Sequence, residues 1–329
     1  MNSTVDRGDA SIGTDVTVLV VNYNTAHLLK DMVAPLRAAE ATLSIDTIVI
    51  DNASRDDSVA FIQREPELAH VRLIENAANV GFGRANNQGV PFARGRYVLL
   101  LNTDAFVEPD TLAKTVAFLD ATPDCGVLGV RLLGRDGHSQ PSCRYFPTPW
   151  NVFLNRSGLS RWFPGTQLVD DSRGSHDTVR ECDWVPGCYL LIRREVIQQV
   201  GLFDPRYFLY SEEVDFCHAV KAAGWKVVYY PHTHVVHWGG ESAKSDAELT
   251  AGQQISDLQI ESELLYFRKH HGRIGVTAFV LLSSLADLLN GLKWILRQRA
   301  FRGLQPLAEH ASSVVGLFAR TRMGKVSTR

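Results

Sequence analysis

The chain has 329 residues, of which 45% are hydrophobic and 21% charged, and its formal net charge is −2. This composition argues against an intrinsically disordered chain, and the length allows one large α/β domain with an appendage or two ordinary domains. The five cysteines form no C-x-x-C pair, which argues against a zinc ribbon or a disulfide framework. Residues 1–15 lack the apolar stretch of a signal peptide, so we expect the catalytic part in the cytoplasm.

The charges are distributed unevenly along the chain. Residues 268–329 hold 11 Lys or Arg against 2 Asp or Glu, whereas the remainder holds 23 against 34. A basic segment of this kind indicates an anionic partner, either a phospholipid surface or a nucleic acid. The segment contains no known nucleic-acid-reading module, so we expect no nucleic-acid partner and favour a membrane surface.

Apolar runs alternate with helical patterns in the first half of the chain, which predicts a parallel sheet covered on both faces. Strands are expected over 16–21, 47–50, 71–75, 97–101 and 127–132, with helices over 27–40, 56–64, 84–94 and 109–121. Loops are expected over 134–180, regular structure again over 182–193, a helix over 213–223, a strand over 226–230, and helices from 247 to the end.

Polar residues follow several of these strands directly, and open α/β sheets bind ligands at the carboxyl ends of their strands. Asn22, Tyr23 and Asn24 follow the first strand, and Asp51 follows the second. Asp51 is a candidate to accept hydrogen bonds from a nucleotide base or ribose, while Ser54, three residues before Asp57, resembles a helix N-cap.

The sequence Asn102-Thr103-Asp104 ends the apolar strand 97–101. A carboxylate in this place can hold a hard divalent cation together with substrate phosphates. The alternative is that Asp104 only stabilises a turn.

Residues 79–89, NVGFGRANNQG, contain a G-x-G but do not match the dinucleotide fingerprint, because the motif follows the third strand and its third glycine is misplaced. We expect a tight turn that leads into a helix whose N–H groups face an anion. Asn86 and Asn87 would then offer amide contacts to sugar hydroxyls, unless they are ordinary polar residues of a helix start.

Three carboxylates, Glu212, Glu213 and Asp215, follow the aromatic run 207–210. A base against aromatic walls has its pKa raised by desolvation, which suits proton abstraction. The alternative is an acidic first helical turn that matches the helix dipole.

Three histidines lie close together at His232, His234 and His237. Strand alternation places the first two on one face and His237 on the other, which argues against a three-histidine zinc site. One histidine could instead join Asp104 and a diphosphate on a cation.

Residues 276–296 are mostly apolar at helical spacing and barely reach the length of a spanning helix. Asp287, Asn290 and Lys293 would be costly at the bilayer centre, so the pattern favours an amphipathic helix in the membrane plane. A helix packed on the catalytic domain or in a dimer shows the same stripe.

Together these residues resemble the family 2 glycosyltransferases with a GT-A fold, and within them the bacterial rhamnosyltransferase-like group. The resemblance runs from about 15 to 242. The segments that carry it are VTVLVVNYN at 16–24, DNASRD at 51–56, NVGFGRANNQG at 79–89, LLLNTDA at 99–105, WVPGCYLLIRR at 184–194, LFDPRYFLYSEEVDFC at 202–217 and VVHWGG at 235–240.

The resemblance implies a Rossmann-like, mostly parallel central sheet with helices on both faces and a C-terminal helical appendage. We expect a flexible N-terminus at 1–14, a catalytic domain at 15–245 and a basic, membrane-associating helical segment at 246–329. The catalytic domain would divide into a nucleotide-sugar half at about 15–130 and an acceptor half at about 131–245.

The resemblance also implies residue roles. Asp104 is similar to the aspartate of the D-x-D-like metal motif, with Asn102 in place of its first acid, and His237 is similar to the histidine that completes metal or diphosphate binding. Glu213 stands where the general base, usually Asp, is found, with Glu212 and Asp215 as neighbouring alternatives. The donor-binding residues implied are Val21, Asn22, Tyr23, Asn24, Asp51, Asn79, Gly81, Arg84, Asn86, Asn87, Asn102, Thr103 and Asp104. The acceptor-binding residues implied are Trp184, Gly187, Tyr210 and Glu212.

The activity implied is transfer of a sugar, with rhamnose from dTDP-rhamnose as the best candidate, to a glycan or polyprenyl-diphosphate-linked acceptor in cell-surface polysaccharide assembly. Mg²⁺ or Mn²⁺ is the expected cofactor. A UDP-hexose or UDP-N-acetylhexosamine donor, or a non-catalytic nucleotide-sugar-binding protein, are the alternatives. We further expect a peripheral location on the inner face of the cytoplasmic membrane, with a homodimer as another arrangement.

Overall fold

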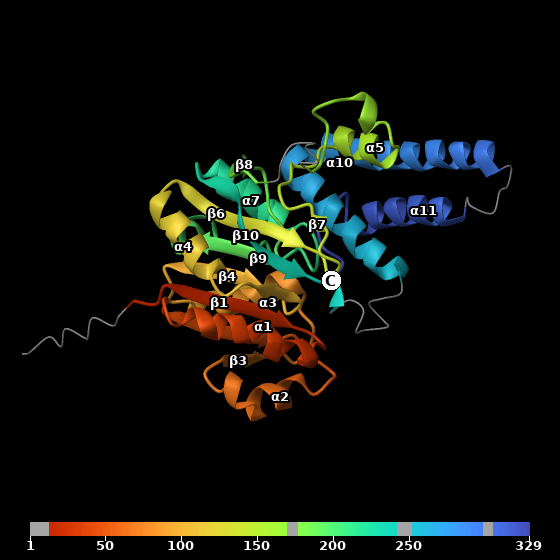
Figure 1. Ribbon diagram of the computed structural model, residues 1–329. Coiled ribbons are helices and arrows are strands. Elements are labelled where there is room, and N and C mark those ends of the chain that lie inside the picture. The colour runs from red at the N-terminus through yellow and green to blue at the C-terminus, as the bar shows by residue number, and fades with distance from the viewer. Residues whose placement is uncertain (1–12, 170–176, 242–251, 299–304) are drawn as a thin grey trace, which may run out of the picture.

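The computed structural model describes residues 13–169, 177–241, 252–298 and 305–329, and centres on one mixed ten-stranded sheet (Figure 1). The main strand order is β3-β2-β1-β4-β9-β6-β10-β5, with β7 beside β6 and β8 beside β10. The strands are β1 (Val16–Asn22), β2 (Ile45–Asp51), β3 (Arg72–Glu75), β4 (Tyr97–Leu101), β5 (Ala105–Val107), β6 (Cys125–Leu133), β7 (Ser139–Gln140), β8 (Arg180–Cys182), β9 (Tyr189–Arg193) and β10 (Lys226–His237).

Helices cover both faces of this sheet. The helices of the described residues are α1 (Ala26–Ala39), α2 (Ser58–Arg64), α3 (Phe82–Gly89), α4 (Thr111–Ala121), α5 (Pro149–Arg156), α6 (Arg194–Val200), α7 (Glu212–Ala222), α10 (Gly252–Gln298) and α11 (Gln305–Arg320). Helices α1 and α4 bury apolar side chains on one face, and α3, α6 and α7 do so on the other. The expected GT-A architecture with helices on both faces is thus confirmed.

The parallel half of the sheet follows from the apolar runs. Strands β3, β2, β1 and β4 are parallel neighbours, and Val18 pairs with Thr47 on one side and Leu99 on the other. Every residue of β4 is buried, as a strand covered on both faces requires. This arrangement brings the carboxyl ends of β1, β2 and β4 to one edge.

Strand β9 changes the second half, because it runs antiparallel to both β4 and β6 and separates them. The regular stretch expected over 182–193 therefore contains parts of two strands, β8 and β9. Residues 183–188 connect these strands. The strand expected over 226–230 continues to His237 as β10.

Two local expectations were wrong. Asp57, not Ser54, occupies the N-cap position of α2, and the Ser54 hydroxyl donates instead to the Asp51 carboxylate at 2.6 Å. The last residues are not helical either, because α11 ends at Arg320 and turns follow.

The C-terminal helices pack directly against the catalytic domain. Helix α10 breaks at Gly272, where φ is 67°, and its first part shares a buried apolar cluster with Tyr207 and Val214. Its second part lies against α5 and α11, so these three helices form a group at one end of the sheet (Figure 1). The expected boundaries at 1–14, 15–245 and 246–329 stay predictions, and residues 1–12 and 242–251 lie outside the described residues.

The second part of α10 is amphipathic in the opposite sense from a helix of a soluble domain: its polar side chains face the protein and its apolar side chains face outward. Asp287 accepts from Arg156 and His310, and Asn290 and Lys293 donate to backbone carbonyls of α5 and its C-cap, so these polar groups face the protein. The outward stripe is apolar and consists of Ile274, Leu281, Leu285, Leu288, Leu292 and Leu296. By length and composition alone, 257–296 could cross a membrane, a criterion that core helices also meet.

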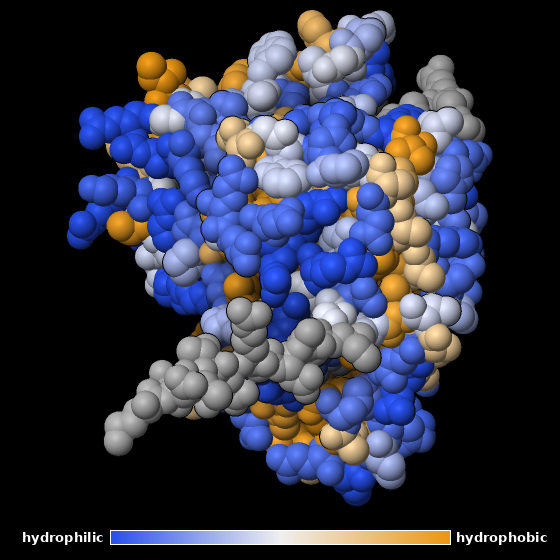
Figure 2. Space-filling view, turned by 90° about the vertical axis from the view of Figure 1, so that its left-hand side faces the viewer, coloured by the Kyte–Doolittle hydropathy of each residue, from blue (hydrophilic) through white to orange (hydrophobic). Residues whose placement is uncertain are grey.

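Another face of the molecule is mostly polar. Seen from the side away from the free ends of α10 and α11, most surface residues are hydrophilic and the hydrophobic ones form narrow patches (Figure 2).

Candidate active site

A cavity of about 430 Å³ opens where β1 and β4 end and where α7 begins. Backbone bonds hold its floor together, because Asn102 N donates to the Cys188 carbonyl at 3.1 Å across β4 and β9. Among the predicted site residues, the cavity is lined by Val21, Tyr23, Asn79, Gly81, Asn102, Thr103, Asp104, Gly187, Tyr210, Glu212, Glu213 and His237. The fold therefore gathers residues that are as much as 216 positions apart, from Val21 to His237.

Asn22, Asn24 and Asp51 hold the strand ends in place. Asn22 is fully buried, and its amide donates to the Asp51 carboxylate at 2.8 Å. Asp51 also accepts from the Ser54 backbone N–H and hydroxyl, and Asn24 accepts from Arg55 N at 2.6 Å. Asp51 lines an adjoining cavity together with Tyr23 and Asn79. Its direct contact with a nucleotide stays a prediction.

The turn before α3 is fixed by a close backbone approach. Gly81 has φ of 88°, and a Cβ there would lie 2.3 Å from the Phe208 carbonyl oxygen, so only glycine fits. The side chains further along α3 contact other groups than the cavity. Asn87 exchanges two hydrogen bonds with the Phe203 backbone, Arg84 donates to the Pro205 carbonyl, and Asn86 donates to the Phe82 carbonyl.

Asp104 and His237 face each other at the carboxyl edge, with 3.6 Å between Asp104 Oδ1 and His237 Nε2. Gln140 fixes the imidazole. Its amide nitrogen donates to the His237 carbonyl at 2.9 Å, so its amide oxygen, 3.0 Å from Nδ1, accepts the ring proton. This leaves the Nε2 lone pair directed toward Asp104. Burial lowers the pKa of His237, which favours this neutral form, although Asp104 opposes the shift.

Among the described residues, no group of three or more His, Cys, Asp or Glu side chains is arranged as a metal site. A carboxylate oxygen and an imidazole nitrogen can nevertheless supply part of a Mg²⁺ or Mn²⁺ coordination shell whose other positions belong to diphosphate oxygens and water. The pair formed by Asp104 and His237 fits such an ion in the presence of a nucleoside diphosphate.

The other two histidines of the predicted group lie elsewhere on β10. His232 is exposed, and His234 Nε2 lies 3.2 Å from Glu108 at the surface. Of the three, only His237 lines the cavity.

The acidic motif begins α7, after a loop in which Tyr210 and Ser211 both have positive φ. Such backbone is strained for residues other than glycine and recurs at functional sites. It places Glu212 and Glu213 on the cavity wall, where an Oε2 atom of each is buried without a hydrogen-bond partner among the described residues. Gly187 leaves room opposite, because a Cβ there would lie 3.8 Å from that of Glu213.

Burial raises the pKa of both glutamates. For Glu212 it is raised well above the ordinary value by burial and by repulsion from Glu213. For Glu213, burial also dominates, but a backbone hydrogen bond and the Arg144 guanidinium counteract it. Of the two carboxyls on this wall, Glu213 is the one whose raised pKa is opposed by a nearby cation, Arg144.

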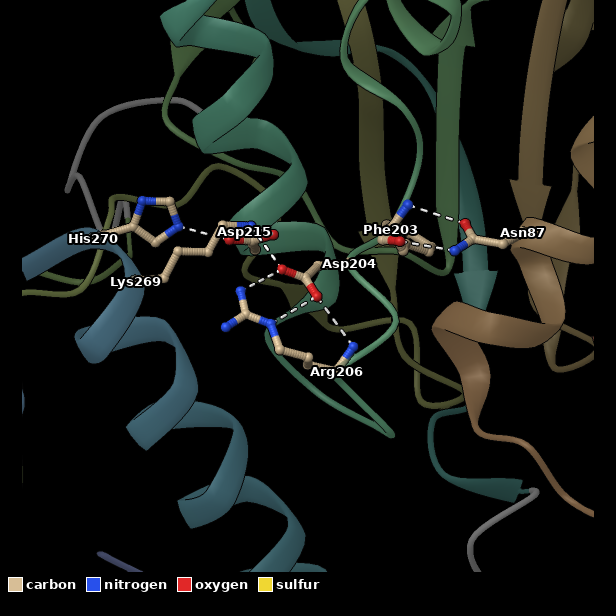
Figure 3. Close-up of polar contacts among 7 residues, drawn as sticks. All are labelled: Asn87, Phe203, Asp204, Arg206, Asp215, Lys269 and His270. Carbon is tan, nitrogen blue, oxygen red and sulfur yellow. Dashed lines mark hydrogen bonds and ion pairs between the residues drawn. The ribbon is translucent and has the colours of Figure 1, made fainter. Parts of the chain in front are cut away.

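Asp215 has a different environment, because its carboxylate is bound by α10 (Figure 3). Lys269 Nζ lies 2.7 Å and His270 Nε2 2.6 Å from its two oxygens. Lys269 also donates to Asp204, which binds Arg206 in turn. These contacts occupy both Asp215 oxygens. Of the three carboxylates in the acidic motif, Glu212 and Glu213 are therefore the two that face the cavity.

Several lining residues were not predicted from the sequence. They are Asn52, Phe82, Arg144, Pro186, Cys188, Phe208, Leu209, Gly240, Glu241 and Leu258. Leu258 belongs to α10, so the C-terminal helix contributes to the wall. Trp184 does not line the cavity itself, but its ring stacks beneath the Arg144 guanidinium at 4.8 Å.

The fold and the site together define a sugar transferase of the GT-A class. A sequence model described as Glycosyl transferase family 2 matches residues 17–201. The chain is 32% identical over 254 residues to N-acetylglucosaminyl-diphospho-decaprenol L-rhamnosyltransferase of Mycobacterium tuberculosis, covering 71% of this chain and 79% of that one. It is 26% identical over 241 residues to rhamnosyltransferase WbbL of Escherichia coli, covering 70% and 86%.

The solved structures agree on the fold. Mannosyltransferase PcManGT of Pyrobaculum calidifontis, in complex with GDP-Man and Mn²⁺, is similar with a TM-score of 0.54 and 16% identity over 94% of this chain and 88% of that one. The chain belongs to glycosyl transferase family 2 and is a glycosyltransferase.

Proposed function

We propose that this glycosyltransferase moves rhamnose from dTDP-rhamnose to a hydroxyl of a polyprenyl-diphosphate-linked glycan, in the assembly of a cell-surface polysaccharide. The relatives named for rhamnosyl transfer support rhamnose as the transferred sugar, and one of them, with diphospho-decaprenol in its name, supports a diphosphate-linked lipid acceptor. The observation that carries the proposal is a buried carboxylate oxygen, Oε2 of Glu213, that has no hydrogen-bond partner among the described residues and lies on the wall of a cavity that also holds Asp104 and His237.

Glu213 is the proposed general base. It accepts the proton of the acceptor hydroxyl while that oxygen attacks the anomeric carbon, and the bond to the nucleoside diphosphate breaks in the same step with inversion. No protein nucleophile is required. Gly187, which has no side chain, lines the same cavity next to the Cβ of Glu213.

Asp104 and His237 are the residues that would hold Mg²⁺ or Mn²⁺. When bound, such an ion neutralises the charge that develops on the departing diphosphate. Gln140 keeps His237 in the tautomer that this role requires.

A donor screen tests the proposal at its first step. Purified protein with Mn²⁺ is heated in the presence of a panel of nucleotide sugars, and we expect dTDP-rhamnose to raise the unfolding temperature most, because a ligand that binds only the folded state stabilises it. A larger shift with a UDP-hexose or UDP-N-acetylhexosamine would move the donor assignment to that alternative. Binding without transfer to any acceptor would favour a non-catalytic nucleotide-sugar-binding protein.

We also propose that the enzyme is cytoplasmic and peripheral on the inner face of the membrane, with the exposed stripe of α10 as the contact. Leu281, Leu288 and Leu296 are 65%, 69% and 71% exposed on this stripe. Burying these exposed leucine side chains in a lipid interface is favourable, and basic residues nearby add attraction to anionic lipids. The side chains of Arg297, Arg299 and Arg302, expected to contact headgroups, lie outside the described residues.

Flotation with anionic liposomes tests this contact. The full chain should float with the vesicles, and Leu288→Glu with Leu292→Glu should abolish flotation, whereas Ala38→Glu on the exposed side of α1 should leave it unchanged. A wild-type chain that stays soluble with vesicles, and instead forms a dimer that the double substitution dissociates, would assign the stripe to a homodimer.

A further inference from the structure

Arg144 stands in the cavity wall on a backbone that is fixed on both sides. Its N–H donates to the Trp184 carbonyl at 3.2 Å, and its own carbonyl accepts from Trp184 N and Asp183 N at 3.2 and 3.0 Å. These bonds tie residue 144 to the segment that continues into the lining residues Pro186 and Gly187. These backbone hydrogen bonds therefore hold Arg144 at a fixed place relative to the cavity wall.

The guanidinium is held in one plane before any ligand binds. Nε donates to the Pro141 carbonyl at 3.2 Å, and the group lies over the Trp184 ring at 4.8 Å. The indole is itself anchored, since its N–H donates to the Tyr145 carbonyl at 3.0 Å. A planar fork on an aromatic ring loses little conformational freedom when it binds a planar or tetrahedral anion.

Arg144 also supplies positive charge to a cavity whose other charged groups are mostly carboxylates. Among the described residues that line it, Arg144 is the single Lys or Arg, whereas Asp104, Glu212, Glu213 and Glu241 contribute carboxyl groups. Among the described residues, no carboxylate is within ion-pair distance of Arg144, although the charge of Glu213 acts on it. Its side-chain hydrogen bond comes from Nε, which leaves the two terminal nitrogens without an acceptor among these residues. These nitrogens carry the N–H pairs that bind phosphate oxygens bidentately.

We propose that Arg144 binds the diphosphate group of a substrate through its terminal nitrogens. The proposal rests on the proposed function, in which two substrates carry a diphosphate. We expect the diphosphate of the lipid-linked acceptor, because Arg144 shares a wall with Glu213, where the acceptor hydroxyl lies, while Asp104 and His237 serve the donor at the strand ends. Arg144 would then discriminate diphosphate-linked acceptors from uncharged glycans.

The test compares two acceptors that differ only in the phosphates. One is N-acetylglucosamine on a diphosphate-linked lipid, and the other is the same sugar and chain length joined through an oxygen without phosphate. The wild type should have a kcat/KM about 10- to 100-fold higher for the first, the range that one charge-assisted contact gives. At a pH above the rising limb of the pH profile, Arg144→Gln should lower kcat/KM for the diphosphate-linked acceptor about 10- to 100-fold more than for the phosphate-free acceptor. Arg144→Lys should retain part of the preference.

A second arm measures the donor side by titrating dTDP with Mn²⁺ into the wild type and Arg144→Gln. Weaker dTDP binding with an unchanged acceptor preference would assign the donor's diphosphate to Arg144 and keep the proposed chemistry. Equal losses with both acceptors and unchanged dTDP affinity would overturn the proposal, because they indicate a structural role. No change in either arm would overturn it as well.

The two proposals fail separately. If the wild type transfers sugar to neither acceptor, the proposed function fails, and the dTDP titration then decides the role of Arg144 alone. If Arg144→Gln does not fold, two measurements replace it. The first is the acceptor preference of Arg144→Lys, and the second is the inhibition by inorganic diphosphate of wild-type transfer to the phosphate-free acceptor. Absence of inhibition together with full acceptor preference in Arg144→Lys would then overturn the proposal.

Discussion

Lys269 and Asp215 lie 2.7 Å apart across the contact between α10 and the helix that carries the acidic motif. The same lysine donates to Asp204 in the loop before α7, at 2.9 Å (Figure 3). The C-terminal helix therefore holds the first turn of α7, and through it the wall on which Glu213 stands. This contact joins α10 to the predicted catalytic domain.

Asp215→Asn should lower the free energy of unfolding by about 1 to 3 kcal/mol, because it weakens charge-assisted bonds to a buried carboxylate. A double-mutant cycle with Lys269→Met should show a favourable coupling between the two residues. Chemical denaturation measures both. As a matched control, Asp110→Asn removes the exposed pair with Lys114 and should change stability by less than about 0.5 kcal/mol. Additive effects of Asp215→Asn and Lys269→Met would contradict the contact.

Glu213→Gln keeps the shape of the side chain but cannot accept a proton. We expect kcat to fall about 100-fold or more while donor affinity stays nearly unchanged. Glu212→Gln and Asp215→Asn serve as neighbouring controls in the same assay. If either of them shows this loss and Glu213→Gln does not, the base is assigned to the wrong residue.

The rate should also depend on pH through Glu213. Burial raises the pKa of this carboxyl, and a base acts only when it is deprotonated, so kcat/KM should rise as the pH increases through that raised pKa. Arg144→Gln removes a cation that opposes the shift and should move the rising limb of the profile to higher pH. A profile that falls with increasing pH over this range would be inconsistent with a carboxylate base.

Glu212→Gln should stabilise the fold at high pH. Burial raises the pKa of Glu212, so the folded state binds its proton more tightly than the unfolded state does. Stability from this group is present at low pH and is lost as the pH rises above the unfolded pKa, at about 1.4 kcal/mol for each unit of the shift. The difference in unfolding free energy between Glu212→Gln and the wild type should therefore be larger at pH 8 than at pH 4. A difference independent of pH would show that Glu212 is not buried as a carboxyl.

Asp104→Ala should abolish transfer while the fold and the unfolding temperature stay close to those of the wild type. The carboxylate lies in the turn between β4 and β5 and lines the cavity, so its removal leaves the apolar core intact. Binding of Mn²⁺ with dTDP, followed by calorimetry, should weaken in the variant, because one of the two proposed protein ligands is lost. Full wild-type activity in excess EDTA would exclude the metal role.

The strands of the parallel half of the sheet could mostly be predicted, because each is a short apolar run. A short apolar run can be recognised as a buried strand from its own residues alone. Parallel neighbours end at the same edge, so the residues after β1 and β4 meet there, and Asn102, Thr103 and Asp104 line the cavity at that edge. Their roles stay predictions. The antiparallel insertion of β9 was not predictable from local pattern, because β9 reads like any other buried strand and its neighbours are set by long-range pairing.

The site residues that were missed or displaced share a cause. Arg144 lies in a stretch without periodicity, so nothing in its neighbourhood indicated that it would face the cavity. Arg84 and Asn87 follow a glycine turn that does point to the site, but the 203–205 loop takes up their side chains. Helical spacing placed Glu212 and Asp215 together, and only the packing of α10 separates their roles.

Transfer of rhamnose from dTDP-rhamnose to a diphosphate-linked N-acetylglucosamine lipid measures the central proposal most directly. With purified enzyme and Mn²⁺, we expect one rhamnose to be added, an anomeric configuration inverted relative to the donor by NMR, and a loss of about 100-fold or more in Glu213→Gln. A product of retained configuration, or full turnover by Glu213→Gln, would contradict the proposed mechanism. No transfer from dTDP-rhamnose beside efficient transfer from a UDP-sugar would contradict the proposed substrate.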